Sequence, residues 1–376
     1  MLSPEQKYDL VARRQSFLTP EDAESLKKLL SEKEQPKIAW ETAPTGKPHV
    51  GYFVPLTKLV DFLRAGLHVT VYYMDVYGFI VNYIHSMETV EYRRQYYHHL
   101  VSAILTSLGV PLENMHFVNE SSLSYDPAFV KDSHKLCAIM TQQDAKDITD
   151  EVGQTKMLSP MLCAVQQSLS EPYLDLDIQF GGEDQVGLFN HAKRFIPLLG
   201  YRQREHVMNV IVAGLDGLKM SSSKPAETKI EFLDPPSVVA AKISAASCPA
   251  GEVAQNGVLG MLRDVLVPIS EQRLERLRGQ TGAHVTEGKD LHAVQRPFAT
   301  VDAPEGSIFS IGGRHFPSYE ALEKGFVSGV IGPEDLKAAV VAAFNEVLAP
   351  IQDIYTKSRA WQEVEELAYP GGCNGH

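Results

Sequence analysis

Two segments of this sequence contain residues that could bind phosphate groups. Lys219-Met220-Ser221-Ser222-Ser223 combines a cation with three hydroxyl donors, just after the turn Gly214-Leu215-Asp216-Gly217. Far upstream, Pro44-Thr45-Gly46-Lys47-Pro48-His49-Val50-Gly51-Tyr52 places a histidine where an expected strand and turn give way to a helix. A helix N-terminus offers free N–H groups and a partial positive charge, so it attracts phosphate. The pair therefore indicates a phosphate-binding site.

Each segment also has an ordinary structural explanation. The upstream one could be a Pro/Gly turn before a helix, with His49 on the surface, and the other a flexible serine-rich linker. In the functional interpretation, His49 hydrogen-bonds phosphoryl oxygens as pyrophosphate leaves, while Lys219 and the serines stabilise the negative charge that develops there. The presence of both segments in one chain favours the functional interpretation.

A third candidate is Phe180-Gly181-Gly182-Glu183-Asp184-Gln185, after an expected strand. Glycines at a strand end let backbone approach a ligand closely. Asp184 is then placed to accept hydrogen bonds from ribose hydroxyls. A Gly-Gly pair alone is weak support, because it is most often only a turn.

The elements that would position these residues alternate between strand and helix. Strands are expected at 37–41, 69–74, 173–180 and 206–212, and helices at 5–34, 50–63 and 88–108. Such alternation implies a parallel sheet with right-handed crossovers. We therefore predict a doubly wound α/β (Rossmann-like) domain over residues 1–234, with nucleotide at the carboxyl ends of its strands.

Beyond Leu233-Asp234-Pro235-Pro236 the pattern becomes mostly helical. Apolar spacing predicts helices at 237–247, 256–267 and 334–347, within a second domain over 235–364. Residues 272–318 are Gly-rich and polar, which predicts a loop with a short hairpin. A tail is expected over 365–376.

Composition restricts the classes of protein that this chain can be. It has 376 residues, 44% of them hydrophobic, and a formal net charge of −12, which argues against a wholly basic nucleic-acid binder. Its four cysteines have no paired spacing, so neither a disulfide framework nor a zinc site is indicated. The charged segment from Met1 to Arg14 predicts no secretory signal, and no apolar run approaches the ~20 residues of a membrane span. A reducing cytoplasm is the expected compartment.

In order, separation and flanking residues, the three segments resemble those of class I aminoacyl-tRNA synthetases, in the form of the eukaryotic and archaeal tyrosyl-tRNA synthetases. The resemblance covers nearly the whole chain, including 330–337 and 348–351, which are similar to the family's helical anticodon-binding domain. It implies a homodimer through an insertion at about 110–170, and Mg²⁺-bound ATP as cosubstrate without a protein metal site. It also implies two steps, formation of an aminoacyl-adenylate and transfer to a tRNA 3′ end.

The same resemblance assigns roles to individual residues. Those expected to act in catalysis are Thr45, His49, Lys219, Ser221 and Ser222. Those expected to hold ATP are Gly46, Gly51, Gly182, Asp184, Met208 and Ser223. Many class I loops have a second lysine at the position of Ser222 in this chain. A serine at that position resembles the eukaryotic tyrosyl enzymes, and Lys224 lies just beyond it.

The expected amino-acid pocket departs from the family. It is formed by Ala39, Met74, Cys163, Gln167, Ser170 and Gln185. Ala39 and Ser170 stand where the family has the Tyr and Asp that bind the substrate hydroxyl, and Cys163 replaces a Tyr near the α-amino group. We therefore expect tyrosine to lose its usual advantage, because a buried hydroxyl without a partner is costly. The alternative is a shifted alignment within 160–172, or other side chains that bind the hydroxyl.

Recognition of the anticodon is also expected to be weak. Asp335 matches the family's Asp that pairs with the first anticodon base, but the aromatic residue expected before Gly312-Gly313 is Ile311. Base–aromatic stacking is worth ~1–3 kcal/mol, so its loss would weaken binding.

The sequence therefore predicts an adenylate-forming ligase with an altered amino-acid pocket. An ordinary tyrosine–tRNA ligase is one alternative. Others are a biosynthetic paralogue that passes the adenylate to a small amine, and a pseudo-synthetase with a regulatory or RNA-binding role. The presence of His49, Lys219, Asp184 and Gln185 argues against the last. The substrate is expected to be an aromatic or related amino acid, not necessarily tyrosine. Which amino acid it is, and which acceptor, stay open.

Overall fold

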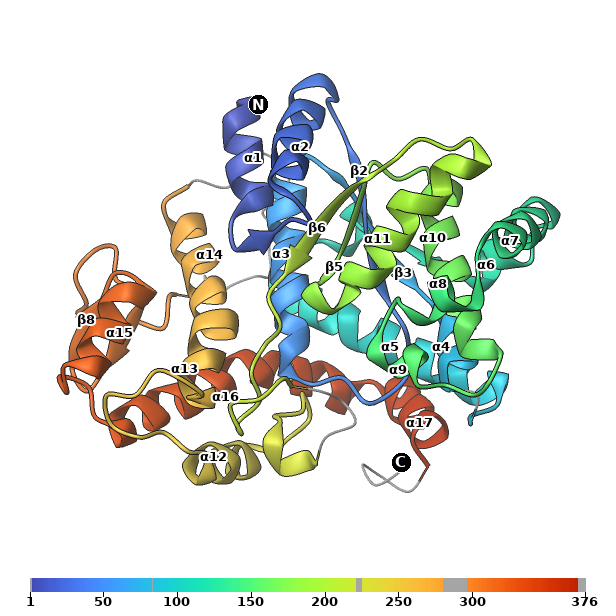
Figure 1. The fold of residues 1–376 in the computed structure, drawn as a ribbon. Coiled ribbons are helices and arrows are strands. Elements are labelled where there is room, and N and C mark those ends of the chain that lie inside the picture. The colour runs from blue at the N-terminus through green and yellow to red at the C-terminus, as the bar shows by residue number, and fades with distance from the viewer. Residues whose placement is uncertain (1, 83, 221–224, 280–295, 371–376) are drawn as a thin grey trace.

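A central, mostly parallel sheet organises the chain (Figure 1). The computed structural model describes residues 2–82, 84–220, 225–279 and 296–370. Within them, six strands lie in the order β1-β6-β5-β2-β3-β4, and only β1 is antiparallel to its neighbour. The strands are β1 (Gln15–Ser16), β2 (Lys37–Thr42), β3 (His68–Tyr73), β4 (His116–Asn119), β5 (Ile178–Gly182) and β6 (Glu205–Asn209). The doubly wound prediction is confirmed, and the order reverses between β2 and β5, where such folds bind ligands.

The two faces of this sheet differ in chemistry. Side chains alternate between the faces along a strand. On one face, Trp40, Val71 and Phe180 pack in the main apolar core with α3 (Phe53–Arg64) and α5 (Met87–Ser107). The opposite face, covered by α10 (Cys163–Tyr173) and α11 (Val186–Phe195), contains Glu41 and Gln179. The apolar core therefore supports the sheet on one face, whereas the other face presents polar side chains that can contact a ligand.

The remaining helices extend the sheet domain and form the C-terminal region. Those before β6 are α1 (Pro4–Ala12), α2 (Pro20–Glu32), α4 (Asp75–Asn82), α6 (Ser121–Ser124), α7 (Pro127–Ile139), α8 (Gln142–Lys146) and α9 (Asp150–Gly153). Those after it are α12 (Pro236–Ala245), α13 (Gly257–Met261), α14 (Val267–Leu277), α15 (Tyr319–Val327), α16 (Pro333–Lys357) and α17 (Arg359–Ala368). No helix among the described residues is both long and apolar enough to cross a membrane.

Several element boundaries differ from the sequence-based prediction. The expected strand 173–180 begins only at Ile178, because α10 continues to Tyr173 and a turn with Asp175 at a φ of 51° follows. The expected loop 272–318 begins inside α14 and contains the predicted hairpin, formed by β7 (Phe309–Ile311) and β8 (Arg314–Phe316). Residues 280–295 of that loop lie outside the described residues.

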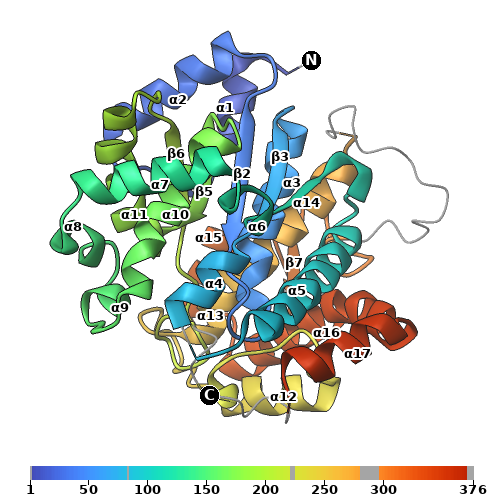
Figure 2. The ribbon, with the colours of Figure 1, turned by 90° about the vertical axis from the view of Figure 1, so that its right-hand side faces the viewer.

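The C-terminal helix lies against the sheet domain (Figure 2). Helices α16 and α17 both contact α5, on the side of α5 away from the strands. Ser358 caps α17 by accepting a hydrogen bond from the N–H of Trp361, and Trp361 is fully buried. The expected tail thus starts inside a packed helix, and residues 365–368 are helical.

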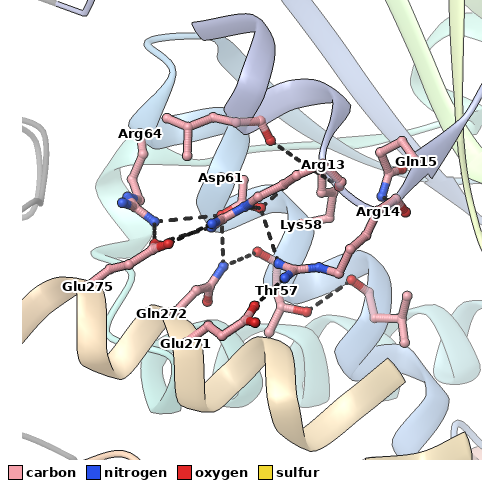
Figure 3. Close-up of polar contacts among 12 residues, drawn as sticks. Arg13, Arg14, Gln15, Thr57, Lys58, Asp61, Arg64, Glu271, Gln272 and Glu275 are labelled. Carbon is pink, nitrogen blue, oxygen red and sulfur yellow. Dashed lines mark hydrogen bonds and ion pairs between the residues drawn. The ribbon is translucent and has the colours of Figure 1, made fainter. Parts of the chain in front are cut away.

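A polar network joins the N-terminal segment, α3 and α14 (Figure 3). Asp61 of α3 is fully buried and accepts hydrogen bonds from Arg13 Nε at 2.7 Å and from Gln272 Nε2 of α14 at 3.0 Å. Glu275 of α14 accepts from Arg13 Nη1 at 2.7 Å and from Arg64 Nη1 at 2.5 Å. Although burial alone would raise it, the charges of Lys58, Arg13 and Arg14 lower the pKa of Asp61 to about 2, so Asp61 is ionised at neutral pH. The two regions of the chain therefore share one ionic junction, which we call the Asp61 junction.

Candidate active site

His49 is held in one tautomer at the start of the helical segment that leads into α3. It caps the short helix Val50–Tyr52, and its Nδ1 accepts a hydrogen bond from the N–H of Gly51 at 3.2 Å. Burial, and then the charge of Lys229, lower the pKa of His49 to about 4. The ring is therefore neutral at physiological pH, and its hydrogen lies on Nε2, free to donate.

Gly51 is required for this arrangement of His49. A side-chain Cβ at position 51 would lie 2.8 Å from the Cε1 atom and 2.9 Å from the Nδ1 atom of the His49 ring, too close for any residue but glycine. At Gly182 a Cβ would lie 2.4 Å from a carboxylate oxygen of Asp184, which is the end of a side chain that can rotate. Gly51 thus leaves the space that the ring of His49 occupies.

A cavity of about 160 Å³ opens at the carboxyl ends of β2, β5 and β6. The three segments around His49, Asp184 and Lys219 all contribute to its wall, as does β6. The lining residues are Trp40, His49, Gly51, Tyr52, Pro55, Gly182, Asp184, Asn209, Val210, Ile211, Val212, Lys219 and Met220. Lys219 Nζ lies 3.3 Å from Asp184 Oδ2, so the two face each other. Five residues singled out from the sequence, among them His49 and Lys219, therefore share one cavity.

Other expected ATP-binding residues are not part of this wall. Met208 is buried in the sheet, and the neighbouring Asn209 lines the cavity instead. Thr45 and Gly46 are absent from the lining, and their carbonyl groups accept hydrogen bonds from the supporting helix α5. Ser221, Ser222, Ser223 and Lys224 lie outside the described residues.

The turn before His49 is supported by the C-terminal helix. Lys47 forms an ion pair with Glu365 of α17 at 2.5 Å, and the Tyr369 hydroxyl donates to the carbonyl of Gly46 at 3.2 Å. Arg93 of α5 joins both segments, because it donates to the carbonyl of Thr45 at 2.6 Å and to that of Ala368 at 3.2 Å. Sequence reasoning missed this contact. The sequence offered one signal that the C-terminal segment is packed. This signal was Trp361, which lies within a helical pattern next to the expected tail.

The expected amino-acid pocket lies on the polar face of the sheet. Gln167 of α10 donates from Nε2 to Gln185 Oε1 at 3.1 Å, so these two side chains are together as expected. Ala39, Met74, Cys163 and Ser170 are all buried around the same face. Burial raises the pKa of the Cys163 thiol, so it is protonated and unreactive at neutral pH.

Glu41 lies among the expected pocket residues, and sequence reasoning missed it. Ser170 Oγ donates to its Oε1 atom, while its Oε2 atom is buried without a hydrogen-bond partner. Burial raises the pKa of Glu41 to about 8, although the hydrogen bond from Ser170 opposes the rise. The available signal was the position of a glutamate two residues after Ala39, on the same face of a buried strand.

The expected anticodon contacts are placed at the β7–β8 hairpin. Asp335 is exposed in the first turn of α16, and its carboxylate would lie 3.3 Å from a Cβ built at Gly312. Ile311 is only 2% exposed and belongs to the core. Its side chain is therefore unable to stack on a base in this conformation.

The fold and the cavity together define the nucleotide-binding domain of a class I aminoacyl-tRNA synthetase, and comparison with known proteins agrees. Residues 31–349 match the family model described as tRNA synthetases class I (W and Y). The cytoplasmic tyrosine–tRNA ligase of Saccharomyces cerevisiae is 37% identical over 376 residues, covering 98% of this chain and 89% of the yeast protein. The chain therefore belongs to the tyrosyl-tRNA synthetase family, of the eukaryotic and archaeal type.

Two further comparisons define the extent of the similarity. The cytoplasmic tyrosine–tRNA ligase of Gallus gallus is 36% identical over 98% of this chain, but the match covers only 64% of the chicken protein. The crystal structure of tyrosyl-tRNA synthetase from Archaeoglobus fulgidus, complexed with L-tyrosine, superposes with a TM-score of 0.76 at 28% identity. That match covers 94% of this chain and 99% of the archaeal one.

Proposed function

We propose that this chain activates an amino acid with ATP, releases pyrophosphate, and transfers the aminoacyl group to tRNA. The observation that supports this most is the shared cavity, in which neutral His49, Lys219 and Asp184 meet at the switch point of a doubly wound sheet. The family relationship supports the same chemistry.

In the proposed reaction, the amino-acid carboxylate attacks the α-phosphorus of ATP, and the bond to pyrophosphate breaks. His49 donates its Nε2–H to a phosphoryl oxygen, and Lys219 balances the negative charge that grows on the leaving group. Asp184 accepts hydrogen bonds from the ribose, and Gln185, oriented by Gln167, holds the α-amino or carboxyl group of the amino acid. Mg²⁺ enters with the triphosphate. Within the described residues, no group of three or more His, Cys, Asp and Glu side chains could hold a metal ion.

Tyrosine is the first candidate substrate, because it is the amino acid named for the relatives from yeast and chicken. A different amino acid is the second candidate. It is favoured by the replacement of the expected hydroxyl-binding side chains with Ala39 and Ser170, and by the carboxyl of Glu41 beside Ser170.

The proposed location is the cytoplasm, in line with the names of the relatives. The proposed assembly is a homodimer, in line with the resemblance of residues 110–170 to a dimerisation insertion. Exposed apolar side chains on this insertion, among them Val130, Ile139 and Leu158, are suited to such an interface.

The proposed function is tested by ATP–pyrophosphate exchange across a panel of amino acids. We expect exchange with at least one amino acid and none without amino acid. Transfer is then measured with total tRNA and with small amines as acceptors. A wild-type protein that exchanges with no amino acid would exclude ligase activity and favour a regulatory or RNA-binding role.

Binding of tRNA should depend only weakly on the anticodon, because Ile311 is buried and no aromatic side chain stands at its position. We expect anticodon variants of one tRNA to differ less than about tenfold in Kd, since stacking is worth ~1–3 kcal/mol. Affinity should fall with added salt, as phosphate contacts release counterions. Discrimination of 100-fold or more among anticodon variants would contradict the prediction, and Asp335→Asn gives the contribution of the remaining contact.

A further inference from the structure

Four buried polar atoms on the polar face of the sheet have no hydrogen-bond partner. They are Glu41 Oε2, Tyr72 Oη, Glu120 Oε1 and Gln179 Oε1. Tyr72 and Glu120 are fully buried, and Gln179 is 1% exposed. Other buried polar atoms of the described residues also lack a partner, but these four gather on one face of the sheet. Because buried polar groups are usually paired, this clustering suggests a missing ligand group.

The four residues lie close together on the sheet. Three of them are on β5, β2 and β3, and the fourth directly follows β4. Glu41 of β2 is opposite Tyr72 of β3, and Gln179 of β5 is opposite Ala39, which shares a face with Glu41. Glu120 directly follows β4, and its N–H donates to the carbonyl of Tyr73 at 2.8 Å. The charges of Glu41 and Glu120 both raise the pKa of Tyr72, which confirms that the three side chains are close together. We call these four residues the carboxyl cluster.

The other polar atoms of the carboxyl cluster already have partners. Glu41 Oε1 accepts from Ser170, Glu120 Oε2 accepts from the N–H of Tyr77 at 2.7 Å, and Gln179 Nε2 donates to Ser170 Oγ at 3.4 Å. The atoms left over are therefore two carboxyl oxygens, one amide oxygen and one phenol. When the carboxyls are ionised, three of these four are acceptors only.

This set of atoms matches a ligand that brings several donors and a positive charge. A phenol hydroxyl donates one hydrogen bond, whereas an ammonium donates three and a guanidinium five. Hydrogen bonds between ionised groups are also about twice as strong as neutral ones. The small side chains of Ala39 and Ser170 lie buried on the same face.

We propose that the carboxyl cluster binds the side chain of the activated amino acid, that this side chain ends in a protonated nitrogen, and that Glu41 selects it. The inference rests on the proposed function, since the cluster lies in an amino-acid pocket only if the chain activates an amino acid. It makes Glu41 a specificity-determining residue of that reaction.

Burial of the cluster supports this assignment. It raises the pKa of Glu41 to about 8 and that of Glu120 well above its usual range, and Glu171 of α10 and Asp75 after β3 add negative charge around them. The carboxyl of Glu41 therefore holds a proton at pH 7 until a cation enters. Binding of a cationic side chain ionises at least one carboxyl, and the proton goes to the buffer.

The test is calorimetric binding of free amino acids, without ATP, at pH 7. The probes are L-lysine, L-arginine and 4-aminomethyl-L-phenylalanine, compared with L-tyrosine and L-phenylalanine. At least one cationic probe should bind tenfold or more tighter than tyrosine and release protons, measured from the difference in heat between buffers of different ionisation enthalpy. Tyrosine binding should release none.

Glu41→Gln should weaken the preferred cationic probe at least tenfold, change tyrosine binding less than threefold, and reduce the proton release. The control Asp177→Asn removes a buried carboxylate at the other end of β5, where it pairs with Lys33, and should change neither affinity.

Several results would overturn the assignment. The wild-type protein alone can contradict the assignment, whether or not the variant folds. It would do this by binding tyrosine more tightly than every cationic probe, or by binding no probe at all. Equal losses for all probes in Glu41→Gln would assign Glu41 a structural role. Pyrophosphate exchange with tyrosine alone would refute the cationic substrate but leave the ligase function standing. Binding of a cationic probe without exchange would refute the ligase function instead.

Discussion

Replacement of His49 with alanine should lower kcat for adenylate formation by about 100- to 1000-fold, the usual effect of removing one preorganised donor to a developing negative charge. Lys219→Ala should have an effect of the same size. The KM for ATP should change much less, because both interactions strengthen only as pyrophosphate leaves. Single-turnover measurement of adenylate formation gives both quantities.

A matched control is Lys357→Ala, which removes an exposed lysine of α16 that does not line the cavity and should leave kcat unchanged. The pH dependence provides a second check. Because the folded-state pKa of His49 is about 4, its ring stays neutral from about pH 5 to 8, and kcat should show no inflection near 6.5 from this residue. A rate that rises as His49 gains a proton near pH 6 would contradict the neutral donor.

The second large effect is expected at Trp361. This side chain is fully buried, stacks on His99 with ring centroids 5.9 Å apart, and meets the edge of Tyr96 at 6.0 Å. Trp361→Ala should therefore lower the free energy of unfolding by about 3–5 kcal/mol, as for other buried aromatic truncations. Denaturant unfolding measures the loss.

The same substitution should also raise the KM for ATP, since α17 supports the turn before His49 through Glu365 and Tyr369. Leu367→Ala, an exposed position on the same helix, is the control and should change neither quantity by much. A destabilised Trp361 variant with an unchanged KM for ATP would show that the turn keeps its conformation without α17.

The fold and the nucleotide half of the site could be predicted from the sequence because their signals are local. The strand–turn–helix around His49 and the glycines beside Asp184 are specified by neighbouring residues. The short strand β4 and the start of β5 were missed or misplaced, because four or five residues give too weak a periodic pattern against the adjacent helices.

The amino-acid half could not be predicted to the same depth because it depends on contacts between distant segments. Ala39 and Ser170 indicated a departure from the family, but the hydrogen bond from Ser170 to Glu41 joins residues 129 positions apart. One alternative left open by the sequence was that other side chains bind the substrate hydroxyl. Glu41 is the side chain that we propose for contact with the substrate side chain. The support of Gly46 by Tyr369 joins residues 323 positions apart and leaves no mark in either local sequence.

The Asp61 junction has a consequence for how the molecule comes apart. One buried anion is shared by the N-terminal segment and α3, while Gln272 and Glu275 of α14 bond to the same side chains. Separation of α14 from α3 and the N-terminal segment would remove several partners from this buried charged network at once. Loss of partners from buried charges costs far more than an exposed ion pair gains. The sheet domain and the helical region should therefore melt in a single cooperative transition. The sheet domain is not expected to stay folded when the helical region unfolds.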